Sequence, residues 1–344
     1  MKLSSSSPTA SAEHVNHVVN YFRSHGFTPI HEAFCFGRYR SVIEQSCGRV
    51  PLSRISQAFQ LFSMISQDPF FGFKLALSDP LFKFQLLLNI FQPTDWRNDE
   101  GSIDEIALFN DVFELSFRKN SGDLELLINT AGTAWVSQYQ FDAVLMVVKK
   151  AIEYFYPNSN FEWHIPRKID NEAREGMCHY LGGEVISEAE CYKVVIPEKM
   201  INPLPTQSPG VRDSNKLSLS KKQTEISAQY HLLQQIWQAM ERTFPSKDAK
   251  LQTVAGLCGL SVRQMQYKLN GLGVSYQQLV DDYFMEAMIK ILLEEENKTA
   301  EHISAQLGFT EMRSYKRAVK RWFDAPFSEV SSHILDVQNK FNTV

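Results

Sequence analysis

Residues 308–323 read GFTEMRSYKRAVKRWF, and their pattern is the main indication of how the C-terminal part of the chain folds. Apolar side chains recur along it at helical spacing, at Met312, Tyr315, Val319, Trp322 and Phe323. Gly308 permits a left-handed turn before the helix, and Thr310 has a hydroxyl suited to an N-cap. The stretch therefore predicts a glycine turn followed by an amphipathic helix over 311–323.

An earlier segment repeats this plan. Val254-Ala255 precedes Gly259-Leu260-Ser261 just as Ile303-Ser304 precedes Gly308-Phe309-Thr310. The small Ala255 and Ser304 let two helices cross closely, and Ser261 is a good N-cap. An apolar stripe follows at Val262, Met265, Leu269 and Leu272. Two copies predict two helix-turn-helix units, whose second helices span 262–270 and 311–323.

Polar and basic side chains lie opposite each apolar stripe. The first copy has Arg263, Gln266, Tyr267 and Asn270 there, and the second has Arg313, Lys316, Arg317, Lys320 and Arg321. This spacing gathers the side chains on one helix face, which a helix in the major groove presents to base edges and phosphates. The net charge of the chain is −4, so the positive charge is local to these helices.

Two plainer interpretations compete with DNA reading. A basic stripe on one helix is more often a solvated face, and glycine turns are common between packed helices. The repetition of turns, caps and faces favours nucleic-acid recognition. A regulator that acts through protein partners without reading DNA remains an alternative, which the intact basic faces argue against.

Residues Leu251 to Ser331 resemble the DNA-binding domain of the AraC/XylS family of bacterial transcription regulators, notably in Gly308-Phe309, the KRWF run at 320–323 and Pro326. The resemblance implies a seven-helix domain in which a long helix, here Ser275 to Leu293, joins the two units. It implies operator or promoter DNA and RNA polymerase as partners, with base contacts from Arg263, Gln266, Tyr267, Arg313, Lys316 and Arg317. Lys320 and Arg321 suit phosphates better.

Three residues depart from the family pattern. Phe284 stands where the connecting helix usually has an arginine, and Val319 replaces a usual phenylalanine. Asp324 replaces a usual glycine, so the turn after the last unit is expected to be strained.

The first 200 residues predict a mixed α and β domain. Helices fit Val15 to Phe22, Leu52 to Met64 and Gln140 to Phe155, and strands fit Phe161 to Ile165 and Tyr192 to Ile196. Alternation with period two on both sides of residues 120–123 predicts a hairpin, with one face made of Phe113, Leu115, Phe117, Leu124, Leu126 and Ile128.

This part of the chain resembles the arabinose-binding-like domain of longer regulators in the same family. The resemblance rests on the order of these elements, on Gly72 to Leu81 with the apolar segment after it, and on residues 192–196 and 202–205. The resemblance implies that this domain binds an unidentified effector, dimerises, or does both. Its frequent aromatic residues suit a hydrophobic effector. The hairpin face either lines an apolar pocket or, more commonly for such residues, forms the core of a sheet.

The predicted architecture is an α+β N-terminal domain followed by an all-α C-terminal domain with two helix-turn-helix units. An effector-binding or dimerisation domain spans 1–201, a Pro- and Ser-rich linker spans 202–224, and the DNA-binding domain spans 225–344. The stripe Ile226, Tyr230, Leu233, Trp237, Met240 and Phe244 predicts a helix that packs on the following domain or, less favoured, forms a dimerising seam.

Composition restricts the class of protein. The sequence shows no pattern of a signal peptide, a membrane span, a phosphate-binding loop or a dinucleotide motif. Its five scattered cysteines suit reduced thiols. We therefore expect a cytoplasmic regulator that is not an enzyme and needs no cofactor. His14 and His17 lack a legible third metal ligand. The enzymatic alternative is a DNA-repair alkyl acceptor with the same DNA-binding domain. It requires a metal–thiolate cluster, for which Cys35 and Cys47 are too few and too far apart.

Overall fold

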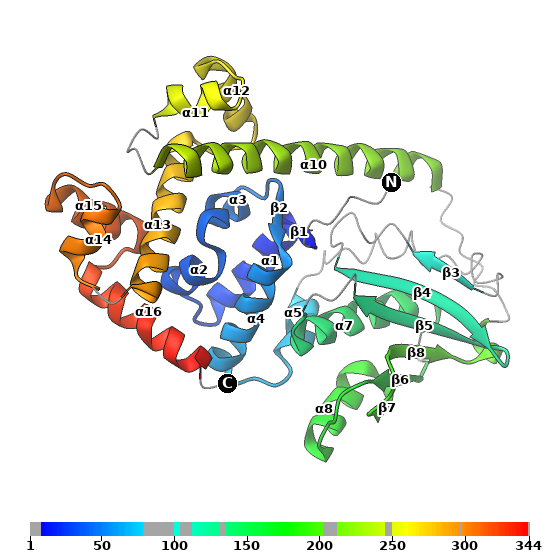
Figure 1. Ribbon diagram of the computed structural model, residues 1–344. Coiled ribbons are helices and arrows are strands. Elements are labelled where there is room, and N and C mark those ends of the chain that lie inside the picture. Colours follow the sequence, from blue (N-terminus) through cyan, green and yellow to red (C-terminus); the bar gives the residue numbers. More distant parts are fainter. Residues whose placement is uncertain are drawn as a thin grey trace. The chain divides into compact units, whose positions relative to one another are not determined.

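A computed structural model describes residues 8–78, 100–103, 112–130, 135–157, 159–201, 212–244, 250–295 and 298–342 (Figure 1). The chain forms two compact units, each built from separate segments. The first comprises Met1–Ala10, Pro51–Phe59 and Ser66–Lys222, and the second Ser11–Val50, Gln60–Ile65 and Gln223–Val344. Strands β1 (Thr9–Ser11) and β2 (Arg49–Pro51) and helix α4 (Leu52–Ser66) span the boundaries in the sequence.

The first unit contains a six-stranded sheet in the order β3-β4-β5-β8-β6-β7. The strands are β3 (Glu100–Ile103), β4 (Phe113–Asn120), β5 (Asp123–Thr130), β6 (Phe161–Ile165), β7 (Gly183–Ser187) and β8 (Tyr192–Ile196). Neighbours are antiparallel except β6 and β7, which are parallel. Its helices are α5 (Phe71–Ser78), α7 (Gln138–Phe155), α8 (Asn171–Leu181) and α9 (Glu198–Ile201).

Alternation along the strands puts one face of this sheet into the core. Leu126 and Trp163 share a buried cluster with Leu145 and Ile152 of α7. The six hairpin residues of the predicted apolar face are in this cluster, and none is more than 6% exposed. The hairpin and the mixed α and β character are therefore confirmed, and the hairpin face is core. Leu81 and residues 202–205, on which the arabinose-binding-like resemblance partly depends, lie outside the described residues.

The second unit is helical and combines both ends of the chain. Its N-terminal elements are α1 (Ala12–Ser24), α2 (Pro29–Phe36), the 3-10 turn η1 (Gly37–Tyr39) and α3 (Arg40–Glu44). Helix α1 packs on α3, whereas α2, η1 and α3 pack on α13 (Tyr276–Glu294). Helix α2 also packs on α16 (Phe327–Asn342) through the Phe34 and Phe341 rings, whose centroids are 5.7 Å apart. This grouping differs from the division at 202–224 that the sequence predicts.

Helix α10 (Arg212–Thr243) corrects the predicted linker. Residues 202–211 lie outside the described residues, but 212–224 are helical. The reason is that no glycine or proline occurs between 212 and 224 to interrupt the helix. The apolar stripe of α10 packs within the chain, since Trp237 is 1% exposed and its ring lies 4.8 Å from that of Tyr39. The predicted packing on the following domain is seen at Phe244, whose ring lies 4.3 Å from those of Tyr283 and Phe284, and the dimerising seam stays a prediction.

Candidate nucleic-acid interface

The first helix pair consists of α11 (Leu251–Leu257) and α12 (Val262–Gly271). Gly259 lies between them with φ of +68°, the left-handed conformation that the turn was expected to need. Ser261 caps α12: its hydroxyl accepts from the Gln264 N–H at 3.2 Å, and the Gln264 side chain accepts from the Ser261 N–H at 2.9 Å. The predicted start of this helix is confirmed.

Burial divides α12 into the two predicted faces. Met265 and Leu269 are at most 1% exposed. Arg263, Gln266 and Tyr267 are exposed, and Tyr267 is 80% exposed although its ring is large and mostly apolar. A solvent-facing aromatic ring beside an arginine and an amide forms a surface suited to base edges and thymine methyl groups.

The second helix pair consists of α14 (Ala300–Gln306) and α15 (Met312–Phe323). Gly308 has φ of +82°, as expected for the turn. The predicted cap is wrong, because Glu311 and not Thr310 occupies the N-cap position of α15, without a side-chain hydrogen bond. The helix begins one residue later than its counterpart in the first pair. The Thr310 hydroxyl therefore lies one position too early to accept from the first turn.

Helix α15 separates apolar and basic side chains sharply. Tyr315, Val319, Trp322 and Phe323 are at most 5% exposed. The five basic side chains predicted for the other face are all exposed: Arg313, Lys316, Arg317, Lys320 and Arg321. Of these, the Arg317 guanidinium donates weakly to the Ser314 hydroxyl at 3.4 Å, and Arg321 is held by an acidic partner described below.

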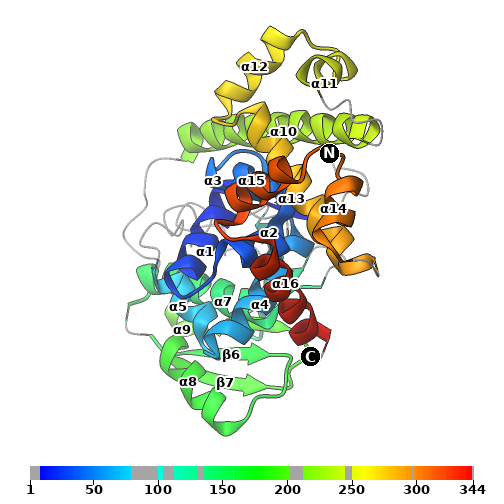
Figure 2. The same ribbon diagram turned by 90° about the vertical axis from the view of Figure 1, so that its left-hand side faces the viewer.

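Helix α13 connects the two helix pairs and packs against the second pair. It spans Tyr276–Glu294, within one residue of the predicted connecting helix at each end, and Ser275 is its N-cap, whose hydroxyl accepts from the Gln278 N–H. In Figures 1 and 2, α12 leads into one end of α13, and α14 and α15 lie beside it. The Phe284 ring stacks 6.2 Å from that of Trp322 and lies 5.5 Å from that of Phe309. Phe284, a departure from the family pattern, thus supports α15 by packing.

One acidic residue of α13 engages the basic face. The Arg321 guanidinium donates to both carboxylate oxygens of Asp281, from Nη2 at 2.6 Å and from Nε at 3.1 Å. Reasoning from the sequence missed Asp281, because it lies 40 residues before its partner and no motif marks it. The pair fixes the Arg321 side chain at the edge of the basic face.

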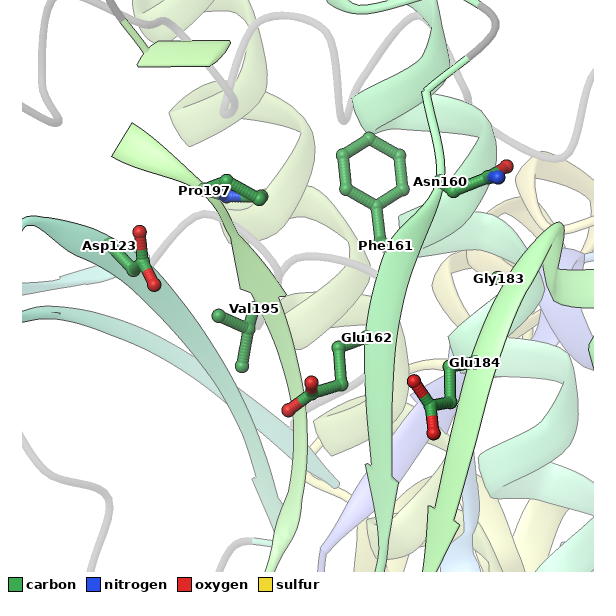
Figure 3. Close-up of a pocket in the computed structure, with 8 residues that line it drawn as sticks. All are labelled: Asp123, Asn160, Phe161, Glu162, Gly183, Glu184, Val195 and Pro197. Carbon is green, nitrogen blue, oxygen red and sulfur yellow. The ribbon is translucent and has the colours of Figure 1, made fainter. Parts of the chain in front are cut away.

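The first unit has an open pocket of about 600 Å³ at the ends of its strands (Figure 3). Glu162 on β6 and Glu184 on β7 are register neighbours, and Asp123 of β5 lies across Val195 from them. Three carboxylates and no basic side chain are among the residues that line it. This acidic pocket is unlike the apolar effector pocket considered from the sequence, and the effector site stays a prediction.

The cysteines show no reactive arrangement among the described residues. None of the five forms a disulfide, and burial raises the pKa of the Cys47 thiol to about 11, which disfavours the nucleophilic thiolate. Within the same described ranges no group of three His, Cys, Asp or Glu side chains could hold a metal ion. No helix there has the length and apolar character needed to cross a membrane.

Comparisons with known proteins add little to these observations. No family model and no curated protein matches the chain. One solved structure that it resembles is the crystal structure of transcriptional regulator CdpR from Pseudomonas aeruginosa, at 14% identity and a TM-score of 0.35, over 80% of this chain and 90% of that one. A likeness at this level supports no conclusion about fold or function, so both rest on the residues of the chain itself.

Proposed function

We propose that this protein is a sequence-specific, DNA-binding transcription regulator of the AraC/XylS type and not an enzyme. The observation that carries the proposal is α15, on which five exposed basic side chains lie opposite the buried side chains of Tyr315, Val319, Trp322 and Phe323. A second helix pair with the same glycine turn presents Arg263, Gln266 and Tyr267. Two such helices suit successive major grooves, over roughly 17 to 20 base pairs.

Each exposed residue has a role in this proposal. Arginine donates in bidentate fashion to guanine, and glutamine pairs with adenine, so Arg263, Gln266 and Tyr267 read bases in one groove. Arg313, Lys316 and Arg317 read bases in the next groove. Lys320 and Arg321 contact phosphates, and Arg321 exchanges Asp281 for a phosphate or keeps both.

The proposal extends to the remainder of the chain. The first unit binds an unidentified effector, for which a hydrophobic compound is the leading class, or mediates homodimerisation. Bound at a promoter, the protein contacts RNA polymerase and acts as an activator in the cytoplasm.

The test is selection from fragmented genomic DNA. Purified wild-type protein and an Arg263→Ala/Arg313→Ala variant are each incubated with the fragments, and the retained DNA is sequenced. We expect the wild type to recover a shared motif that the variant loses. Each substitution should cost roughly 1–3 kcal/mol of binding free energy at its own base position.

A charge-matched control separates base reading from general electrostatics. Lys290 and Lys298 are exposed and lie outside both α12 and α15, so a Lys290→Ala/Lys298→Ala variant should recover the wild-type motif. Recovery without any motif, or equal recovery by the Arg263→Ala/Arg313→Ala variant, would contradict the proposal and favour a regulator that acts through protein partners.

A further inference from the structure

An arginine from the N-terminal helices binds the end of α15. Nη1 of Arg40, the first residue of α3, donates to the Trp322 carbonyl at 2.7 Å and lies 3.7 Å from the Met285 sulfur of α13. The carbonyls of the last helical turn have no partner within the helix, and the macrodipole makes that end negative. A guanidinium at this position therefore satisfies an open acceptor and stabilises the helix end electrostatically.

Two carboxylates lie within ion-pair distance of Arg40, and one of them is buried. Glu32 of α2 is 3% exposed, and both of its oxygens accept from the Arg23 guanidinium of α1 at 2.6 Å. The Arg40 Nε lies 3.8 Å from Glu32 and 3.8 Å from Glu44. The carboxylates of α2 and α3 thus attract the guanidinium that meets α15, and Arg23 of α1 positions Glu32.

Helix α3 is anchored to α13 next to this contact. The Ser41 N–H donates to the buried Asp282 carboxylate at 2.8 Å. The Arg38 guanidinium bridges Glu286 of α13 and Glu241 of α10, and lies over the Tyr283 ring. Gly37 allows this approach, since a Cβ there would come within 2.9 Å of Glu286. These contacts hold η1 and the start of α3 against α13, next to the bond from Arg40 to the end of α15.

We propose that Arg40 is a positioning residue for the second DNA-reading helix: through its bond to the Trp322 carbonyl, the N-terminal helices set how α15 sits on α13. The inference rests on the proposed function, because its consequence is the alignment of Arg313, Lys316 and Arg317 with their groove. Arg40 acts through α15 and needs no contact with DNA.

The experiment compares wild type with Arg40→Met, which keeps the aliphatic stem and removes the guanidinium, and with Arg40→Lys, which keeps the charge. Arg242→Met is the control, because Arg242 is an exposed arginine outside the contact. Hydrogen exchange of the amides of α15 is measured without DNA. Affinity, salt dependence and hydroxyl-radical protection are measured on a duplex that carries the selected motif and on a scrambled duplex.

We expect Arg40→Met to exchange faster in α15 and to lose roughly 10- to 30-fold in affinity for the motif duplex. Protection of the DNA from hydroxyl radicals should weaken only in the half of the site that Arg313→Ala also affects. The slope of the logarithm of affinity against the logarithm of salt concentration should be unchanged. Arg40→Lys should show the same changes at smaller size, because one ammonium cannot reproduce the contacts of a guanidinium. Arg242→Met should behave as wild type.

Three results would overturn the inference. A salt slope reduced by about one would make Arg40 a phosphate contact. Unchanged exchange in α15, or equal loss from both halves of the site, would remove its positioning role. If Arg40→Met fails to fold, the Arg40→Lys chain replaces it in the test. Hydrogen exchange in α15 and affinity for the motif duplex that are both equal to wild type in that chain would also overturn the inference. Failure of the proposed function looks different, since wild type would then bind the motif and scrambled duplexes equally.

Discussion

Asp324 ends α15 in a backbone conformation that favours glycine. Its φ and ψ are +56° and +19°, and its N–H donates to the Lys320 carbonyl at 2.8 Å. The sequence predicted strain at this residue, because a side chain in the left-handed region crowds the backbone. Aspartate is among the few residues that tolerate the region. The conformation is retained because it closes the helix directly after Trp322 and Phe323.

Replacing Asp324 by glycine should therefore stabilise the protein. The substitution relieves the left-handed strain but increases the entropy of the unfolded chain, so we expect a gain of up to about 1 kcal/mol in the free energy of unfolding. Urea titration measures it. Asp324→Ala is the matched comparison, and its free energy of unfolding should fall by about the same amount, because alanine retains the Cβ without the polar group. A glycine variant less stable than wild type would show that the carboxylate has a favourable interaction.

At the scale of elements, α3 and α13 meet at a buried carboxyl group. Asp282 is 6% exposed, and burial raises its pKa from 3.8 to about 7, although the Ser41 hydrogen bond and the Arg40 charge act to lower it. Charged groups from its own helix and from two neighbouring helices line the pocket around it: Asp281 of α13, Arg40 and Glu44 of α3, and Arg321 of α15. The folded chain thus binds the Asp282 proton more tightly than the unfolded chain does.

This difference in pKa fixes the sign of a pH dependence. Between pH about 4 and 7 the folded state holds a proton that the unfolded state has released, so Asp282 lowers stability as the pH rises. Asp282→Asn does not titrate and still accepts from Ser41. We expect the free energy of unfolding of the variant to rise relative to wild type by at most about 1.4 kcal/mol per pH unit in this range.

Urea titrations at several pH values from 4 to about 8 check the expectation. His31, whose pKa burial lowers to about 4, is present in both chains and cancels in the difference. The difference should be flat above pH about 7, where Asp282 is ionised in both states. Parallel profiles over the whole range would mean that the carboxyl group stays ionised when folded.

Patterns among residues close in the sequence predicted the helices and strands. The same patterns could not predict contacts between residues far apart in the sequence. The turn glycines, the Ser261 cap and the buried stripes of α12 and α15 follow from neighbours within one or two helical turns. The Arg40 contact with Trp322 joins residues 282 positions apart, and spacing gives no information about such pairs. The prediction of Thr310 as the N-cap was wrong because α15 begins one residue later. The start of the helix depends on how α15 packs and not on the capping residue alone.

At the scale of the whole molecule, the second unit is discontinuous in sequence. Residues 11–50 pack with 223–344, and they cover Trp237 of α10 and Met285 of α13, each 1% exposed. A fragment cut at the predicted domain boundary, residues 225–344, therefore lacks the helices that bury these side chains. Each large apolar side chain exposed in this way costs about 1.5–3 kcal/mol.

We expect the 225–344 fragment alone to be at least about 3 kcal/mol less stable than the second unit in the full chain and to bind a hydrophobic dye. Coexpression with residues 8–66, which supply α1 to α4, should restore the unfolding midpoint and remove the dye binding. The control is the same segment with Gly37→Val, whose side chain collides with Glu286 and whose φ of +48° disfavours valine. It should not restore either property. A fragment that unfolds at the midpoint of the full chain, with or without its partner segment, would show that α10 to α16 form an independent domain and that the N-terminal helices only rest on it.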